Sequence, residues 1–183
     1  MTVRLITMTA AVIAALCSVL SLLISLIYIR RCEMRQARRA ALEPIIDDLG
    51  GTVYSLIAVS KRMGFSRGSE RYRENKAKAM ETARALDHLR WQSRYALWGL
   101  NDGLHHLVLL PKWIEHLRGR DESCARLIDL ATELRQAVDD EVRRCWLQGA
   151  APSRRSIRRI DRAAGRMKTF YLESKVPPAG PPA

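Results

Sequence analysis

The longest uncharged run in the chain extends from Leu5 to Ile29 and reads "LITMTAAVIAALCSVLSLLISLIYI". As an α-helix these 25 residues would be about 37 Å long, which exceeds the roughly 30 Å hydrocarbon core of a bilayer. A cleaved signal peptide would have a shorter apolar region that ends at a small-residue site, whereas this run ends in "YIRRC". The sequence therefore predicts a retained transmembrane anchor over residues 1–29.

The charges that flank this run predict its orientation. Arg4 is the one charged side chain before it, whereas a cluster of arginines follows it: Arg30, Arg31, Arg35, Arg38 and Arg39. Positive charge accumulates on the cytoplasmic side of membrane helices, so we expect the amino terminus outside and the rest in the cytoplasm. This topology predicts a single-pass protein of an inner (plasma) membrane, with the five arginines near anionic phospholipid headgroups.

Small residues recur within the run at spacings of 3, 4, 3 and 4, namely at Ala11, Ala14, Ser18, Ser21 and Ser25. This spacing keeps them on one helix face, where small side chains let a second helix approach closely in lipid. Two interpretations stay open. Either the stripe mediates association with a second copy or another membrane protein, or its residues are simply tolerated in a spanning helix.

Beyond the anchor, the apolar spacing is helical, with no strand-like alternation of any length. We expect a basic juxtamembrane helix or linker over residues 30–43 and an antiparallel bundle of about four to five helices over residues 44–175, with coiled-coil-like packing. The tail "VPPAGPPA", residues 176–183, predicts disorder. The fold class is therefore all-α.

Local signals predict where these helices begin. Pro44 suits a first helical turn, and Ser69, Asp121 and Ser153 are each placed to cap a helix. A long helical pattern continues from residue 70 to residue 100. We expect the four tryptophans, Trp91, Trp98, Trp113 and Trp146, to be core or rim residues.

The net charge of +12 favours a polyanionic neighbour, and the most basic segment is "SRRSIRRIDRAAGRMK", residues 153–168. As a helix it has an apolar face of Ile157, Ile160, Ala164, Met167 and Tyr171. The opposite face carries Arg154, Arg155, Arg158, Arg159, Arg162 and Arg166. Three interpretations stay open: solvated arginines, some of them paired with Asp139, Asp140 and Glu141; contact with the anionic inner leaflet; or contact with nucleic acid. The last is disfavoured because no nucleic-acid-binding motif is present and an anchor restricts access.

No motif for phosphate binding, nucleophilic catalysis or metal binding is found. Cys124 and Cys145 fall on one predicted helix about 30 Å apart, beyond disulfide reach, so we expect reduced thiols. Cys32 is either a lipidation site or a bystander. Asp102 with His105 or His106 lacks the carboxylate partners of a bundle metal site. We therefore expect no enzyme activity, no cofactor and no metal.

These features favour a membrane-anchored helical interaction module, such as a scaffold, adaptor or regulatory subunit. It would act at the cytoplasmic face of a membrane, and the Ala- and Arg-rich composition favours a bacterial host. One alternative is a membrane-acting effector of a toxin or phage-defence type, which oligomerises and perturbs the bilayer. Another is a membrane-tethered nucleic-acid-binding protein.

Overall fold

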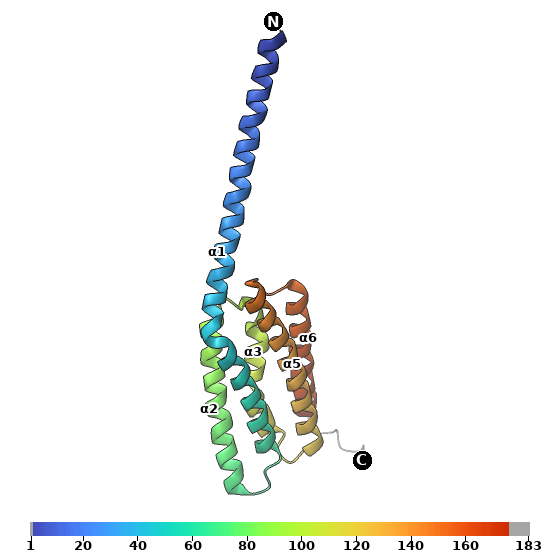
Figure 1. Cartoon of the computed structure of the whole chain (residues 1–183). Coiled ribbons are helices and arrows are strands. Elements are labelled where there is room, and N and C mark those ends of the chain that lie inside the picture. The colour runs from blue at the N-terminus through green and yellow to red at the C-terminus, as the bar shows by residue number, and fades with distance from the viewer. Residues whose placement is uncertain (1, 176–183) are drawn as a thin grey trace, which may run out of the picture. The chain divides into compact units, whose positions relative to one another are not determined.

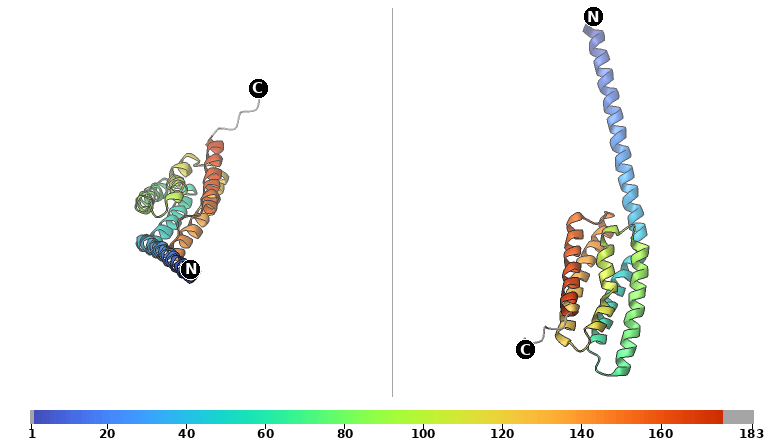
Figure 2. Two further views of the ribbon diagram at one scale, coloured as in Figure 1. Left: turned by 90° about the horizontal axis from the view of Figure 1, so that it is seen from above. Right: turned by 180° about the vertical axis from the view of Figure 1, so that it is seen from behind.

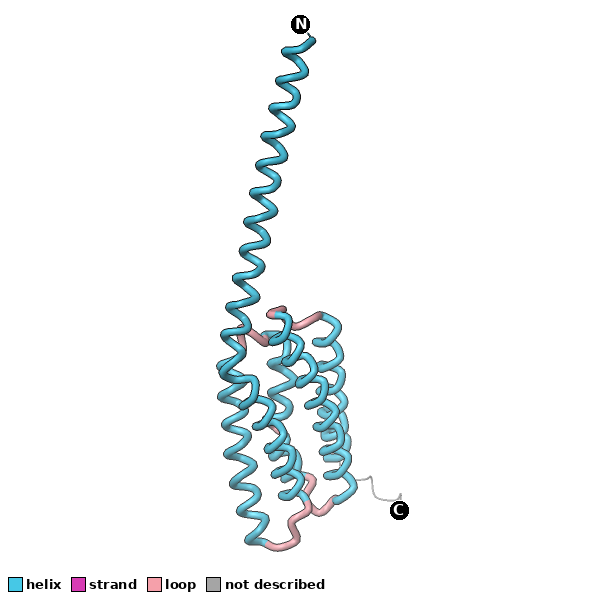
Figure 3. Tube along the Cα trace, viewed as in Figure 1, coloured by secondary structure: helices cyan, strands magenta, loops and turns pink. Residues whose placement is uncertain are grey.

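A computed structural model describes the backbone of residues 2–175 and the side chains of residues 16–175. Every regular element in this part of the chain is helical, which confirms the all-α prediction (Figures 1 and 3). The elements are α1 (Thr2–Gly64), α2 (Ser69–Ser93), the short 3₁₀ helix η1 (Trp98–Leu100), α3 (Asn101–Val108), α4 (Leu110–His116), α5 (Asp121–Gln148) and α6 (Arg154–Lys175).

The chain divides into two compact units, residues 1–37 and residues 38–183. The first unit consists of the amino-terminal part of α1, in which every large apolar side chain described between Leu16 and Ile29 is exposed. Among the residues whose side chains are described, no helix contains a stretch that is long and apolar enough to cross a bilayer. The predicted anchor lies partly outside that range, because the side chains of residues 5–15, including Ala11 and Ala14, are not among those described. The predicted disordered tail, residues 176–183, also lies outside the described residues.

The second unit is an antiparallel helical bundle, as the sequence predicts (Figure 2). A short connection at 65–68 joins α1 to α2, and residues 47–55 of α1 face residues 81–85 of α2 across a shallow groove. The α5 helix also runs antiparallel to α1, with the Arg135 guanidinium 5.5 Å from the ring centre of Tyr54. The α5 and α6 helices form a second hairpin, and α3 contacts α2, α5 and α6.

The core is built from apolar side chains at helical spacing. Fully buried members include Leu42, Val53, Leu56, Met63, Leu86, Leu104, Leu127, Leu134, Ile160 and Met167. Residues three or four positions apart share one helix face, so burying that face removes a continuous apolar stripe from water. The predicted inward stripe of α5 is confirmed: Leu127, Ala131, Leu134, Val138, Val142 and Cys145 are all buried.

Gly99 in η1 and Gly103 in α3 allow both helices to pack closely against α6. A Cβ at Gly103 would lie 2.5 Å from Cγ2 of Ile160, well inside van der Waals contact. A Cβ at Gly99 would collide with Cδ1 and Cγ1 of Ile157. The absence of a side chain at both positions lets α6 seat its isoleucines directly against the backbone.

Some predicted helix ends are wrong. Pro44 lies inside α1, which extends without interruption from Thr2 to Gly64. Leu42 and Ile45, on either side of the proline, are buried in the core. Neither Ser69 nor Asp121 is a cap: each is the first residue of its helix, after Gly68 and Arg120 respectively, and neither helix has a side-chain cap hydrogen bond.

The pattern expected to be one helix over residues 70–100 is also divided. The α2 helix ends at Ser93, and a turn and the short η1 helix follow it. Leu97 and Leu100 remain buried after the helix has ended, so tertiary packing preserves the apolar pattern without a continuous α-helix.

Candidate functional site

The arginine face of α6 is the most basic surface that the sequence predicts. All six arginines are exposed, and Ile160, Ala164, Met167 and Tyr171 on the opposite face are buried, with Ile157 half-buried. The predicted two-sided character of this helix is confirmed. Along the arginine face there is a shallow hollow of about 550 Å³, lined by Arg155, Ser156, Arg159, Arg162 and Arg166.

Two of these arginines pair with carboxylates of α5. Arg159 lies 3.5 Å from Asp140, and Arg166 lies 2.8 Å from Glu133. All four side chains are largely exposed, and pairs of this kind contribute only about 0–1 kcal/mol each. The remaining four arginines of the face, Arg154, Arg155, Arg158 and Arg162, form no ion pair within residues 16–175. The face therefore keeps most of its positive charge available for an external anion.

Only one of the three predicted carboxylate partners is confirmed. Asp140 pairs with α6, but Asp139 lies 3.8 Å from Arg135 of its own helix. Glu141 points into the protein and pairs with Arg144. Glu133, two turns earlier on α5, takes the place of these two residues as a partner of α6.

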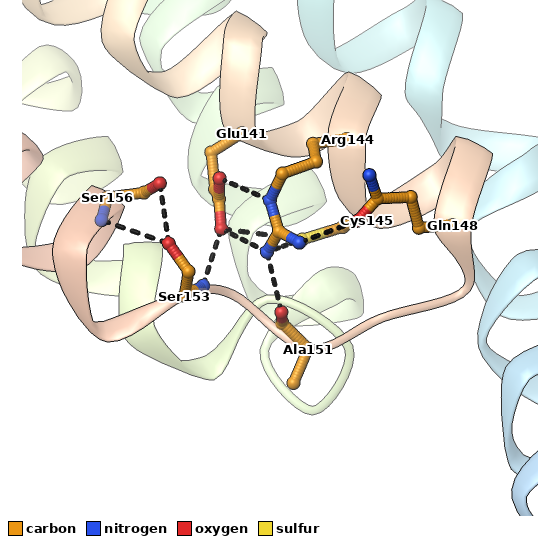
Figure 4. Close-up of polar contacts among 7 residues, drawn as sticks. All are labelled: Glu141, Arg144, Cys145, Gln148, Ala151, Ser153 and Ser156. Atoms are coloured by element: carbon orange, nitrogen blue, oxygen red, sulfur yellow. Dashed lines mark hydrogen bonds and ion pairs between the residues drawn. The ribbon is translucent and has the colours of Figure 1, made fainter.

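Glu141 organises the turn between α5 and α6 (Figure 4). Its side chain is only 3 % exposed, and Arg144 donates to both carboxylate oxygens, from Nε at 2.8 Å and from Nη2 at 2.6 Å. The Ser153 backbone N–H donates to Oε1 at 2.6 Å. Arg144 also donates to the Ala151 carbonyl at 2.8 Å and to the Gln148 side chain at 2.9 Å. One buried carboxylate thus ties the end of α5 to the first residue before α6.

The backbone of this turn provides the other constraints. Gly149 ends α5 in the left-handed region, with φ of 59°, a conformation that glycine adopts without steric cost. The predicted cap at Ser153 is confirmed, because its Oγ accepts a 3.1 Å hydrogen bond from the Ser156 N–H. The turn therefore determines where α6 begins and in which direction Arg154 and Arg155 project.

Electrostatics at the turn follow from this geometry. Burial alone would raise the pKa of the Glu141 carboxyl, but the hydrogen bonds from Arg144 and the Ser153 N–H outweigh it and hold that pKa below its ordinary value. Burial and the neighbouring Glu141 charge raise the pKa of the Cys145 thiol to about 11. Cys145 is consequently an inert thiol packed beside an ionised carboxylate.

The predicted juxtamembrane arginines fall in both units. Arg30, Arg31 and Arg35 belong to the first unit and are exposed. Arg38 and Arg39 belong to the second, where Arg39 donates from Nη2 to the Leu147 carbonyl in the last turn of α5. A cation at a helix carboxyl terminus is favoured by the helix dipole, so Arg39 also acts as a cap for α5.

Sequence reasoning missed a cluster of aromatic and arginine side chains at the end of α2. Trp91, Tyr95 and Trp98 are 54 %, 79 % and 61 % exposed, whereas Trp113 is buried, as expected of a core residue. Arg94 lies over the rings of Trp91 and Tyr95, 5.3 and 4.6 Å from their centres. Alternation of arginine with aromatic residues in "RWQSRYALW" was the signal that could have indicated this surface.

The histidines have structural partners. His116 Nδ1 shares a 2.7 Å hydrogen bond with the Tyr171 hydroxyl, and the Tyr171 ring stacks on Trp113 with a centroid separation of 4.8 Å. No cluster of potential metal ligands occurs among the side chains described here. Cys124 and Cys145 are both buried and unbridged in α5, and Cys32 is a half-buried free thiol.

Comparisons with known proteins do not identify a relative of this chain. No protein-family model, curated protein or solved structure matches the chain.

Proposed function

We propose that this protein is a single-pass membrane-anchored helical interaction module, not an enzyme. Residues 5–29 form the anchor, and the bundle acts at the cytoplasmic face as a scaffold, adaptor or regulatory subunit. The observation that carries the proposal is the uncharged run itself, together with the exposure of its described half. Between Leu16 and Ile29 the apolar side chains are more than half exposed, and an apolar surface of this extent indicates contact with lipid or protein.

The basic surfaces support contact between the cytoplasmic part and anionic headgroups. Arg30, Arg31 and Arg35 follow the apolar run directly, where the positive-inside rule expects cations. The four unpaired arginines of α6 add charge that no described carboxylate neutralises. Each arginine close to an anionic leaflet contributes about 1 kcal/mol of attraction.

Membrane fractionation tests the anchor. Full-length protein expressed in bacteria should stay in the membrane pellet after extraction with alkaline carbonate. Replacing Leu20 and Leu23 with arginine should release it, because each charge within a spanning helix costs up to about 2.5–3.5 kcal/mol, the value at the helix centre. Leu172→Arg is the matched control, since Leu172 is a comparably exposed leucine on α6. Release of the wild-type protein by carbonate would overturn the proposal.

Arginine modification tests the headgroup contact. Phenylglyoxal should modify Arg154, Arg155, Arg158 and Arg162 more slowly in vesicles that contain phosphatidylglycerol than in phosphatidylcholine vesicles, and high salt should restore the rate. Exposed Arg126 on α5 serves as an internal reference. Equal rates in both vesicle types would contradict the contact.

Crosslinking in intact membranes tests the interaction role. An adaptor or scaffold should crosslink at fixed stoichiometry to a second copy or to one defined membrane protein, and its expression should leave growth unaffected. Depolarisation and growth arrest on expression, abolished when Ser18 and Ser21 are replaced with leucine, would instead support the effector interpretation.

A further inference from the structure

The aromatic and arginine side chains at the end of α2 form a built surface. Trp91, Tyr95 and Trp98 fall within eight residues and are all more than half exposed. Arg94 lies over both Trp91 and Tyr95 and donates a 2.8 Å hydrogen bond to the Tyr95 hydroxyl. Arg90 lies 5.2 Å from the Trp91 ring centre, but its side chain is only 11 % exposed and pairs with Asp87. These stacked contacts hold amphipathic rings beside fixed positive charges instead of burying them.

This surface lies at the end of the bundle where the second unit begins. Residues 47–55 of α1 face residues 81–85 of α2, so the antiparallel register brings the end of α2 level with the residues around 40. Arg39 bonds Leu147, which places the end of α5 at the same level. Gly99 abuts Ile157 and Pro152, so η1 adjoins the α5–α6 turn. Figures 1 and 2 show the segment after α2 and the α5–α6 turn at one end of the bundle.

The same end is strongly basic. Residues 143–158 contain five arginines and no acidic residue, and Arg144 is the one of the five that pairs with the buried Glu141 carboxylate. Arg39 on α1 and Arg94 directly after α2 add to this charge, whereas Arg90 is paired with Asp87. Tryptophan and tyrosine concentrate at the membrane interface because their rings are apolar while their N–H and O–H groups remain hydrated, and basic residues there attract anionic lipid.

Chain length puts this end within reach of headgroups. Arg38, the first residue of the bundle unit, follows Ile29 by nine positions, which span at most about 30 Å even when fully extended. A surface tethered so closely meets lipid at a far higher effective concentration than any soluble partner.

We infer that Trp91, Tyr95 and Trp98, with Arg94, dock the end of the bundle onto the headgroup region of an anionic leaflet. This inference rests on the proposed membrane anchor and adds a specific lipid contact of the bundle to it. The aromatic rings enter the interface, the Arg94 guanidinium contacts lipid phosphate, and docking restricts the orientation of the bundle relative to the membrane.

Tryptophan quenching in vesicles tests the contact with the full-length chain. Spin-labelled lipids with the label at headgroup depth should quench the emission in vesicles of phosphatidylcholine and phosphatidylglycerol, and less in phosphatidylcholine alone. The variant W91F/W98F should lose most of the quenchable emission. Trp113→Phe is the matched control, since Trp113 is buried and its loss should leave the quenched component intact.

Arg94→Gln tests the charge contribution. Arg94 is exposed and its partners are the neighbouring rings, so the fold should survive, which circular dichroism checks. The equilibrium constant for docking of this surface onto anionic vesicles should fall about fivefold in the variant. Unchanged docking would overturn the role assigned to this arginine.

Carbonate extraction of the same vesicles separates the two proposals. Protein released by carbonate would refute the anchor, and with it the proposed function. Protein that resists carbonate but whose Trp91 and Trp98 emission is quenched by aqueous iodide, and not by the lipid label, would refute the docking surface alone. In that case the surface would face water or bind a protein partner.

Discussion

The Ser153 backbone N–H donates a 2.6 Å hydrogen bond to Oε1 of Glu141, twelve positions earlier in the chain. This contact crosses the α5–α6 turn and ends on a carboxylate that is almost completely buried. It connects the last turns of α5 to Ser153, the residue that precedes the arginine-rich helix α6. The basic face of α6 therefore depends on a carboxylate that no external ligand reaches.

Glu141→Gln should destabilise the bundle by about 3 kcal/mol, because it leaves the Arg144 guanidinium without its charged partner and weakens the bond from Ser153. Urea unfolding in mild detergent, followed by circular dichroism at pH 7, measures the loss. Glu133→Gln is the control: it removes an exposed carboxylate of the same helix and should cost less than about 1 kcal/mol. Equal losses would contradict the buried role of Glu141.

The lowered pKa of Glu141 also predicts how the effect of this substitution on the unfolding free energy depends on pH. The folded-state pKa of Glu141 lies below the ordinary value of 4.5, so its ionised form stabilises the protein above that pH. This contribution is lost as the pH falls through the folded-state pKa. The difference in unfolding free energy between wild type and Glu141→Gln should therefore be constant near neutrality and shrink below pH 4.5. A difference in unfolding free energy that grows as the pH falls would contradict this prediction.

Gly103→Ala should destabilise the protein although alanine is the better helix former. The new Cβ would lie 2.5 Å from Cγ2 of buried Ile160, and overpacking of this kind costs about 1–3 kcal/mol. Gly165→Ala on α6 has open space around its Cβ and should stabilise by up to about 1 kcal/mol. Thermal unfolding of the two variants should shift in opposite directions, and a shared direction would contradict the close approach of α3 to α6.

Tyr171→Phe should cost about 1 kcal/mol, because it removes the hydroxyl bonded to His116 and keeps the ring stacked on Trp113. Tyr171→Ala should cost about 3–5 kcal/mol through loss of the buried ring. Urea unfolding measures both changes. The emission of Trp113 should change in the alanine variant and stay near that of wild type in the phenylalanine variant.

The buried cysteines should be chemically silent in the folded protein. Burial raises the pKa of both the Cys124 and Cys145 thiols, so little reactive thiolate exists near neutral pH. In a Cys17→Ala background, a water-soluble maleimide should label Cys32 rapidly and the other two only after denaturation. Mass spectrometry of tryptic peptides reports each site, and rapid labelling of Cys145 in folded protein would show that the α5–α6 turn opens.

Local sequence patterns predicted the helices and the faces they bury. The inward stripe of α5, the apolar face of α6 and the cap at Ser153 all follow from side-chain spacing along a single helix, which is a local property. The same reasoning misplaced the start of the helix at Pro44. Burial of Leu42 and Ile45 on either side of the proline is a tertiary interaction that the local signal does not contain.

Which side chains meet was decided only by the tertiary structure. Glu141 and Asp140 are adjacent in sequence, yet one is buried against Arg144 and the other is exposed beside Arg159. Likewise, Trp113 packs inside while Trp91 and Trp98 face outward. The period of a helix determines which residues share a face, but the rotation and register of each helix against its neighbours determine what that face contacts. The sequence therefore specified an all-helical chain with a long uncharged segment and a basic last helix, and packing between helices decided which charges and rings remain at the surface.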